Sequence, residues 1–458
     1  MHLSQLSSGS VKFRFISFLL KDTEQKLQIA MSEQARRVAV IGAGISGLAT
    51  IRNLLSSDRK YIIKCFERGC DIGGVWLYNE NADKDEFGMN VFSSMYRDLI
   101  GNFPRQLMEF PGFPNTEPEK SSSYLHREEV FNYIKRFCKH YDLEKYIQTH
   151  TYVTDISPKT NERCPEWTVS YRDVRDKEIK QADFDAVFVC TGHQHTPYIP
   201  DIDGVEEFQG EIIHSKNYRI PEKFADKRIV ILGAAFSGTD LTFAIAPHAQ
   251  QIFLSHIKDR LESVLPENVT QKPGIKRMTQ KTVVFLDDTE AEVDVLLLCT
   301  GYRYSFPFLS DDVITATRDK VTPLYKHVVN VKYSNLFFVG ILEFVHYFGM
   351  GHMMSKYAVR VLDGDAILPS ETEMLKDIDN DFELRKQRGD KPHLFSMNEQ
   401  IWQLDKEFAK LAGVAPSPDA FEKLSDFVYN HGIKNNLGNY REKKFKFSED
   451  RKSFKIVN

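Results

Sequence analysis

The sequence predicts an α/β protein with two dinucleotide-binding (Rossmann-like) domains, the smaller one inserted in the larger. An apolar strand, a glycine-containing turn and a helix follow one another twice, starting near residue 37 and again near residue 228. Each unit also closes on a buried strand that ends in Thr-Gly, at residues 191–192 and 300–301. Because each such unit binds one nucleotide, we expect two nucleotides on one chain.

Length and charge agree with this fold and exclude several kinds of partner. The chain has 458 residues and a formal net charge of −4. Such a balanced charge offers no basic surface for nucleic acid, so a small molecule is the expected partner. No apolar run approaches the ~18 residues that cross a bilayer, and no membrane span is expected. The six cysteines show no Cys-x2-Cys pair, which predicts neither a metal site nor a disulfide framework.

The folded part of the chain is expected to begin at Met31. Residues 1–30 are interpreted as an N-terminal extension or a weak targeting segment, because their apolar run at 15–20 is shorter than the ~7–15 residues of a secretory core. The sparse cysteines favour a reducing compartment. We therefore expect a cytoplasmic protein. Secretion or import into an organelle is the alternative if residues 1–30 act as a targeting peptide.

The first predicted strand, 37–41, leads into a turn that fits a dinucleotide. Gly42 permits the tight turn, Gly44 lets the backbone approach a pyrophosphate, and Gly47 allows the next helix to pack on the strand. That helix is expected at 48–55, with the positive end of its dipole facing the phosphates.

The rest of the first unit places an acid and a set of loops around this turn. A second strand, 62–66, ends at Glu67, where a carboxylate can accept the hydroxyls of a ribose. Residues 73–115 are rich in Gly, Pro, Asn and Phe, which indicates irregular loops lining a site. The periodicity then predicts a helix at 127–141 and strands at 167–171 and 185–190.

The second unit repeats the pattern with one substitution in its turn. Strand 228–232 precedes Gly233 and Gly238, but Ala235 stands where the middle glycine would be. A methyl group there still admits a pyrophosphate, at a somewhat greater distance. A helix is expected from Thr239.

The end of the next strand distinguishes the two nucleotides. Strand 251–255 is followed by basic residues and not by an acid, and a 2′-phosphate requires such cations. This favours NADP over NAD, with Lys258 and Arg260 as candidate ligands that the sequence does not separate. An acid in the first unit and cations in the second predict FAD in the first and NADPH in the second.

These assignments divide the chain into three further parts. The FAD domain is expected to comprise residues 31–200 and 295–458, with a helical C-terminal portion, and the NADPH domain residues 201–294. The aromatic loop 344–348 is expected either to line the substrate cavity or to pack in the core. A helix after 349–352 would point its N terminus at the flavin.

The fate of the reduced flavin depends on a further group of residues. A disulfide reductase needs a redox-active cysteine pair beside the flavin ring, but Cys65 and Cys70 lie near Glu67, at the adenosine end. A monooxygenase needs a dry site and a hydrogen-bond donor for a flavin C4a-hydroperoxide. Asn102 is the candidate donor.

Several ordered motifs resemble one family. The stretch 208–218, FQGEIIHSKNY, matches the FxGxxxHxxx(Y/F) signature of flavin-containing monooxygenases and lies, as in that family, between the two nucleotide motifs. Tyr218 stands where Baeyer–Villiger relatives carry Trp, which argues against that branch. The resemblance to this class B family extends from about residue 36 to the end of the chain. Further matching motifs are GGVW at 73–76, SSMY at 93–96, GNFP at 101–104, CTGH at 190–193 and CTGY at 299–302.

The resemblance implies roles for individual residues. Asn102 matches the active-site asparagine, which lies near the flavin and the retained NADP. His214 belongs to the signature, but as a single residue it is interpreted as a structural histidine with satisfied hydrogen bonds. The cofactor-binding residues expected from the motifs and the resemblance are Gly42, Gly44, Gly47, Glu67, Gly74, Trp76, Asn102, Thr191, Gly233, Ser237, Gly238, Lys258, Arg260, Thr300 and Gly301.

The resemblance also implies a reaction. NADPH reduces FAD, oxygen adds to the flavin C4a, and a soft nucleophile, an amine nitrogen or a sulfide, takes up one oxygen atom. Residues 268–273 and 445–458 are similar to insect members of the family, some of which detoxify pyrrolizidine alkaloids by N-oxygenation. The expected partners are therefore O2 and an amine, sulfide or alkaloid, and a homo-oligomer is compatible with the sequence.

Two alternatives remain from the sequence alone. An NADPH oxidase that releases hydrogen peroxide would share every motif. A non-catalytic flavoprotein scaffold is the non-enzyme alternative, and Asn102 and the two turns argue against it.

Overall fold

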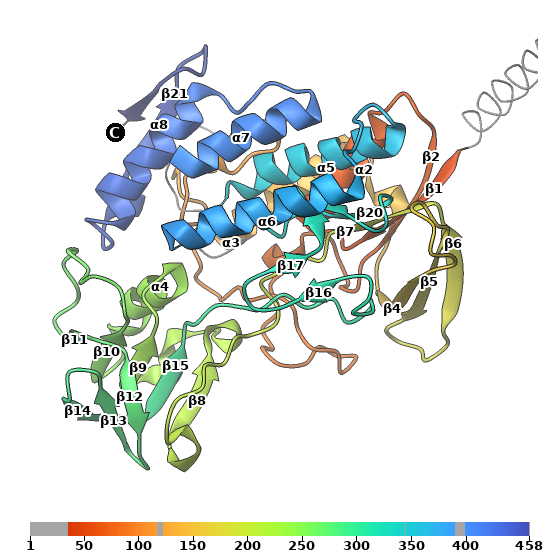
Figure 1. Cartoon of the computed structure of the whole chain (residues 1–458). Helices are drawn as coiled ribbons and strands as arrows, with labels where there is room; N and C mark the ends of the chain where they lie inside the picture. Colours follow the sequence, from red (N-terminus) through yellow and green to blue (C-terminus); the bar gives the residue numbers. More distant parts are fainter. Residues whose placement is uncertain (1–34, 117–121, 344, 390–398, 458) are drawn as a thin grey trace, which may run out of the picture.

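The computed structural model describes residues 35–116, 122–343, 345–389 and 399–457 (Figure 1). The predicted N-terminal extension, 1–30, lies outside the described residues.

The first unit is built on a seven-stranded sheet with the order β18-β19-β20-β7-β1-β2-β3. Strands β3, β2, β1, β7 and β20 run parallel, and Val40 of β1 lies opposite Cys65 of β2 and Phe188 of β7. Such strands read as continuous apolar runs because both faces of the sheet are covered. The strands are β1 (Arg36–Ile41), β2 (Tyr61–Phe66), β3 (Ile147–Gln148), β7 (Ala186–Val189), β18 (Leu324–Tyr325), β19 (Val329–Asn330) and β20 (Leu336–Phe338).

Helices cover one face of this sheet and a small antiparallel sheet covers the other. On the helical face, the apolar side chains of α2 (Ile45–Leu55), α3 (Arg127–His140) and α5 (Tyr347–Asp363) form one core with the strands. On the opposite face, Trp167 belongs to a second core. The small sheet consists of β4 (Thr151–Pro158), β5 (Trp167–Asp173) and β6 (Lys180–Phe184).

The second unit has a five-stranded parallel sheet with the order β11-β10-β9-β15-β8. The residues of β9 alternate between two cores, since Ile229 and Ile231 face α4 (Phe236–Ile245) and Val230 faces a three-stranded antiparallel sheet. The strands are β8 (Glu211–His214), β9 (Arg228–Leu232), β10 (Gln251–Ser255), β11 (Val269–Lys272), β12 (Ile275–Met278), β13 (Thr282–Phe285), β14 (Glu290–Glu292) and β15 (Val295–Leu298).

Three details of the fold correct the sequence-based expectations. β15 pairs with β8 and β9, so the predicted domain boundary at residue 294 is too early. Helix α5 begins at Tyr347, so residues 349–352 lie inside its first turns and not before it. The C-terminal portion is not helical throughout, because it ends in the hairpin of β21 (Lys444–Phe447) and β22 (Phe454–Val457).

The C-terminal segment contacts both units. Its helices are α6 (Glu371–Arg388), α7 (Glu399–Ala412) and α8 (Asp419–Val428), and a short two-stranded sheet, β16 (Thr315–Ala316) and β17 (Val321–Thr322), precedes them. α7 packs in the core beside α5, and the Leu437 backbone N–H donates to Ser263 Oγ of the second unit at 2.9 Å. In Figure 1 this segment (blue) lies next to both the first-unit helices and α4.

Asn335 joins the two sheets of the first unit. Its side-chain oxygen accepts from Trp167 Nε1 at 3.1 Å, and its Nδ2 donates to the backbone oxygens of Pro165 and Asp185 at 2.7 and 2.8 Å. Asn335 and Trp167 are both buried. The three hydrogen bonds therefore replace water for groups that water cannot reach.

We expect Asn335→Ala to lower the free energy of unfolding by about 2–5 kcal/mol, because the substitution leaves buried donors and acceptors unpaired. Urea denaturation monitored by tryptophan fluorescence measures this loss. Asn435→Ala is the control, since Asn435 is exposed and its side chain donates to the nearby Asn430 backbone oxygen. Equal midpoints for Asn335→Ala and the unsubstituted protein would contradict the joining role.

Candidate active site

Two glycines of the first turn are required by the protein's own packing. Gly42 has a φ of +99°, and a Cβ atom there would lie 2.8 Å from the Cys190 carbonyl oxygen. A Cβ atom at Gly47 would lie 1.9 Å from the Gly42 oxygen. Side chains at these two positions would push α2 away from β1 and β7.

Gly44 differs, because no protein atom requires a glycine there. Its φ is −77°, which any residue adopts, and a Cβ atom would lie 3.5 Å from Gly74 Cα and 3.8 Å from Gly74 N, both ordinary van der Waals distances. Gly44 is also the N-cap of α2 and provides no side-chain cap, and the first turn of α2 contains no acid. The uncapped N–H groups and the open face above Gly44 fit a diphosphate.

Two further groups of the first unit surround this turn. Glu67 Oε2 accepts from the Ala43 backbone N–H and Oε1 from the Gly69 N–H, both at 2.7 Å, so the side chain braces the turn against the end of β2. Burial raises the pKa of Glu67 despite these two bonds. Thr191 Oγ1 is buried and makes no hydrogen bond to the described residues, as expected of a group that awaits a ligand.

The second turn reproduces the geometry of the first. A Cβ atom at Gly233 would lie 2.5 Å from the Cys299 oxygen, and one at Gly238 would lie 1.8 Å from the Gly233 oxygen. Ala235 takes the place of the middle glycine and is the N-cap of α4, again with no side-chain cap. A second dinucleotide therefore fits this turn, with a methyl group beside its phosphates.

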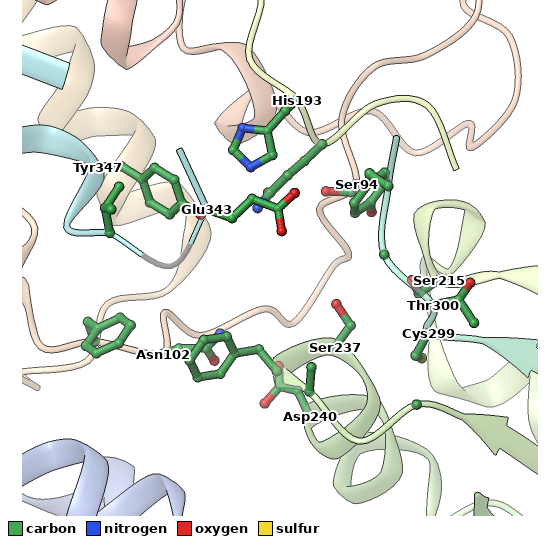
Figure 2. Close-up of a pocket in the computed structure, with 18 of the residues that line it drawn as sticks. Ser94, Asn102, His193, Ser215, Ser237, Asp240, Cys299, Thr300, Glu343 and Tyr347 are labelled. Atoms are coloured by element: carbon green, nitrogen blue, oxygen red, sulfur yellow. The ribbon is translucent and has the colours of Figure 1, made fainter. Parts of the chain in front are cut away.

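A cavity of about 700 Å³ lies between the two units (Figure 2). Both helices that follow the turns begin at this cavity, since their first residues, Ile45 and Phe236, line it. Nucleotides bound at the two turns would therefore extend into one shared space. This is the arrangement that hydride transfer between two cofactors requires.

The structure divides the predicted site residues into two groups. Those that line the cavity are Trp76, Asn102, Gly233, Ser237, Lys258, Thr300 and Gly301. Those that do not are Gly42, Gly44, Gly47, Glu67, Gly74, Thr191, Gly238 and Arg260. Most of the second group form or surround the two turns, whereas Arg260 is exposed beyond the end of β10. The structure thus separates Lys258 from Arg260.

Asn102 occupies the cavity wall within a network that the motifs did not indicate. Its Oδ1 accepts from Arg441 Nη2 at 2.5 Å, and Arg441 Nη1 forms an ion pair with Asp240 Oδ1 at 2.7 Å. Asp240 also lines the cavity. Neither residue lies in a motif, and Arg441 belongs to a charged run that is typical of an exposed surface.

Another wall of the cavity carries His193 and Glu343 (Figure 2). His193 Nδ1 lies 3.1 Å from the Gly340 carbonyl oxygen, and because a carbonyl only accepts, Nδ1 carries the proton. Nε2 is then an acceptor, and it is buried without a partner among the described residues. Burial lowers the pKa of His193, so the ring is neutral.

His214 has the structural role that was predicted for it. Its Nε2 lies 3.0 Å from the Gly301 oxygen, and its Nδ1 accepts from the Lys216 backbone N–H at 3.1 Å. Burial lowers its pKa to about 4. With both nitrogens bonded, His214 fixes the signature segment to the Thr-Gly turn after β15.

Apolar residues close the remaining part of the cavity, and several come from the C-terminal helices. Residues 345–348 line it, and Val345 and Phe348 also pack in the core of the first unit, so both alternatives expected for this loop hold in part; Phe344 lies outside the described residues. The His346 ring stacks on Trp402 of α7, with centroids 5.2 Å apart. The other large apolar side chains include Phe103, Leu107, Met108 and Ile401.

The cysteines do not form a redox pair at this site. Cys65 is buried, its Sγ lies 3.7 Å from the Gly42 oxygen, and burial raises its pKa well above the usual value. Cys70 is exposed, and neither residue lines the cavity. Cys299 lines the cavity, but it is a single buried thiol whose pKa burial raises to about 12, so the disulfide reductase alternative lacks the cysteine pair that it needs there.

Comparisons with known proteins agree with this geometry. The family model described as flavin-binding monooxygenase-like matches residues 35–261 and 256–422. Senecionine N-oxygenase of Tyria jacobaeae is 32% identical over 450 residues, 95% of each chain. Trimethylamine monooxygenase of Methylocella silvestris is 34% identical over 353 residues, 75% of this chain and 78% of its own. The solved structure of S-allyl-L-cysteine S-oxygenase from Allium sativum has a TM-score of 0.82 and 29% identity, and the alignment covers 92% of this chain and 97% of that one.

The two kinds of glycine in the first turn predict opposite effects. Gly44→Ala is expected to change the free energy of unfolding of the cofactor-free protein by no more than about 0.5 kcal/mol, but to weaken FAD binding tenfold or more, because the methyl group fills the open face. Gly47→Ala is expected to cost about 3 kcal/mol in unfolding free energy because its Cβ meets the Gly42 oxygen. Urea denaturation and FAD titration measure the two effects. Undiminished FAD affinity in Gly44→Ala would contradict the proposed site.

Proposed function

The chain belongs to the flavin-binding monooxygenase-like family, and on that basis we propose that it is an NADPH- and O2-dependent N-oxygenase of tertiary amines, pyrrolizidine alkaloids among them. FAD at the first turn and NADPH at the second are its proposed cofactors. The observation that carries this proposal is the position of Asn102, in a cavity at which both cofactor-binding helices begin. The relative that is similar over 95% of the chain, an N-oxygenase, supports nitrogen as the oxygenated atom.

The cofactors supply the redox chemistry, since FAD reduced by NADPH activates dioxygen. The residues of this chain provide three other functions. The uncapped N termini of α2 and α4 hold the diphosphates by their backbone N–H groups. Asn102 Nδ2 offers a hydrogen bond to an oxygen atom in the cavity. Phe103, Leu107 and residues of α7 give part of the cavity an apolar lining that limits the access of water.

The remaining polar groups suit an amine substrate. An amine nitrogen must carry a free lone pair to react with an electrophilic oxygen, so the neutral form is the one that reacts. His193 Nε2 is a neutral acceptor and Glu343 lies on the same wall, so a protonated amine can donate its N–H there on entry, before it releases the proton and reacts in its neutral form. The apolar remainder of the cavity accommodates the carbon skeleton.

The direct test incubates the purified, FAD-loaded protein with NADPH, oxygen and single substrates: trimethylamine, senecionine and a dialkyl sulfide. We expect mass spectrometry to show a gain of one oxygen atom on an amine, with close to one product per NADPH oxidised. Oxidation of NADPH coupled only to the reduction of O2 to hydrogen peroxide, with every substrate, would contradict the proposal and favour the oxidase alternative. Oxygenation of the sulfide only would contradict nitrogen as the target atom.

Asn102→Ser is the matched variant for this assay. We expect it to keep FAD but to lower the product per NADPH about 10- to 100-fold, because a hydrogen bond to a charged group contributes about 1.5–3 kcal/mol. The NADPH that is oxidised without forming product should appear as hydrogen peroxide. Unchanged product per NADPH would remove Asn102 from the mechanism.

Lys258 lines the cavity beyond the end of β10, so we propose that it binds the 2′-phosphate of NADPH. Because the side chain is exposed, Lys258→Met should raise the KM for NADPH only about two- to tenfold and leave the KM for NADH unchanged. Arg260→Met is the matched control, two residues along the chain and away from the cavity. Steady-state kinetics with both coenzymes measure the effects, and equal effects on NADPH and NADH would contradict phosphate recognition.

A further inference from the structure

Arg441, in the C-terminal segment before β21, connects three parts of the molecule. Its Nη2 donates to Asn102 Oδ1 at 2.5 Å, its Nε to the Gly101 carbonyl oxygen at 3.3 Å, and its Nη1 pairs with Asp240 at 2.7 Å. The guanidinium also lies over the Tyr440 ring, 4.9 Å from its centroid. All three nitrogens therefore have a partner, and each partner lies far from Arg441 in the sequence.

The contact with Asn102 determines which way the amide faces. A guanidinium donates and never accepts, so the amide atom that meets Arg441 must be the oxygen. The nitrogen, Nδ2, is then directed away from Arg441 and makes no hydrogen bond to the described residues. Asn102 is labelled on the cavity wall in Figure 2. The donor that the proposed reaction needs is therefore left available to the cavity.

The contact with Asp240 connects this amide to the second cofactor-binding helix. Asp240 lies in α4, whose N-terminal end forms the second turn, and it also accepts from the Tyr96 hydroxyl of the first unit. The side chains of Arg441 and Asp240 are only 23% and 16% exposed. Burial disfavours the charge of Arg441, but the nearby Asp240 carboxylate outweighs it and the pKa of Arg441 is raised. Arg441 therefore keeps its charge in this ion pair.

We propose that Arg441 is a positioning residue for the oxygenation reaction. It holds the Asn102 amide with its nitrogen toward the cavity and fixes that orientation relative to α4, so that the hydrogen-bond donor and the second nucleotide are set by one side chain. The proposal rests on the proposed function, since it assigns Arg441 to the same site. A lysine cannot replace Arg441, because a single ammonium lacks the planar arrangement that reaches Asp240, Asn102 and Gly101 together.

The test compares Arg441→Lys with Arg451→Lys in the FAD-loaded full-length protein. Arg451 is the matched control because it also lies near the C terminus and pairs with a buried carboxylate, Glu109, but is not bonded to Asn102 or Asp240. Hydrogen peroxide per NADPH oxidised should rise about threefold or more in Arg441→Lys and stay near the unsubstituted value in Arg451→Lys. A wild-type peroxide yield in Arg441→Lys would overturn the proposal.

The variant Asn102→Asp tests whether Arg441 acts by orienting the Asn102 amide or only by stabilising the fold. The carboxylate keeps a partner for Arg441 but has no N–H to present, so the cofactor-free variant should keep its thermal midpoint while the loaded enzyme releases peroxide. Adding Arg441→Lys to Asn102→Asp should not raise the peroxide yield further, because Asn102→Asp has already removed the donor that Arg441 orients. Additive peroxide yields would show that Arg441 acts elsewhere and would overturn the proposal.

The cofactor-free protein gives a readout that does not depend on turnover. In a cycle of Asn102→Ala, Arg441→Lys and the double variant, the thermal midpoint of the double variant should fall by less than the sum of the two single shifts. Strict additivity would contradict the contact. If Arg441→Lys does not fold, Asp240→Asn replaces it, and a wild-type peroxide yield in that variant would overturn the proposal.

The outcome also distinguishes this proposal from the proposed function. If the unsubstituted protein oxygenates an amine and Arg441→Lys does so equally well, only the positioning role is wrong. If the unsubstituted protein releases peroxide with every substrate, the proposed function is wrong and the positioning role is overturned with it.

Discussion

The architecture of the site depends on the close contact between a helix N terminus and the end of a strand, made twice. At both turns a Cβ atom on the last glycine would lie less than 2 Å from the carbonyl oxygen of the first, at 1.9 Å for Gly47 and 1.8 Å for Gly238. This contact fixes where α2 and α4 begin, and their first residues line one cavity. The anion-binding N termini of two helices, each packed on a different sheet, therefore lie at the same cavity. Any side chain at these glycines would displace both a helix and the cofactor that it holds.

Binding phosphates by backbone groups also explains why the overall charge gives so little indication of the ligands. Two dinucleotides carry several negative charges, yet the formal net charge of the chain is −4. The N-caps of α2 and α4 have no side-chain cap, and neither first turn carries an acid, so N–H groups and helix dipoles can balance the diphosphates. A charged side chain is then needed only to distinguish one nucleotide from another, as proposed for Lys258 and the 2′-phosphate that NADPH has and NADH lacks. Within the cavity, two polar groups have a direction fixed by their hydrogen bonds: His193 Nε2 accepts and Asn102 Nδ2 donates.

Local patterns predicted the parts of the site that are local in structure. The strands at 37–41 and 228–232 and the two turns follow from short stretches, because a tight turn between a buried strand and a helix requires glycine at fixed spacing. Asn102 was found differently, through the resemblance of its GNFP motif to a known family. Arg441 could not be found in this way. It contacts Asn102 across 339 positions of sequence, and it lies in a run of charged residues that is normally solvated. Helix α5 also begins before the expected position, at Tyr347, because tertiary packing overrides the low helix propensity of the glycines at 349 and 351.

The Arg441–Asp240 ion pair is not explained well by its contribution to the free energy of folding. Removing two charges from water costs several kcal/mol, and apolar residues of similar volume often serve stability as well or better, by about 1–4 kcal/mol. Apolar side chains could not, however, distinguish the oxygen of the Asn102 amide from its nitrogen. A guanidinium can, because it has donors only, and it is held in place by a carboxylate on the helix that begins at the second turn. The buried charge is thus better explained by the direction that it imposes on one amide than by the stability that it adds.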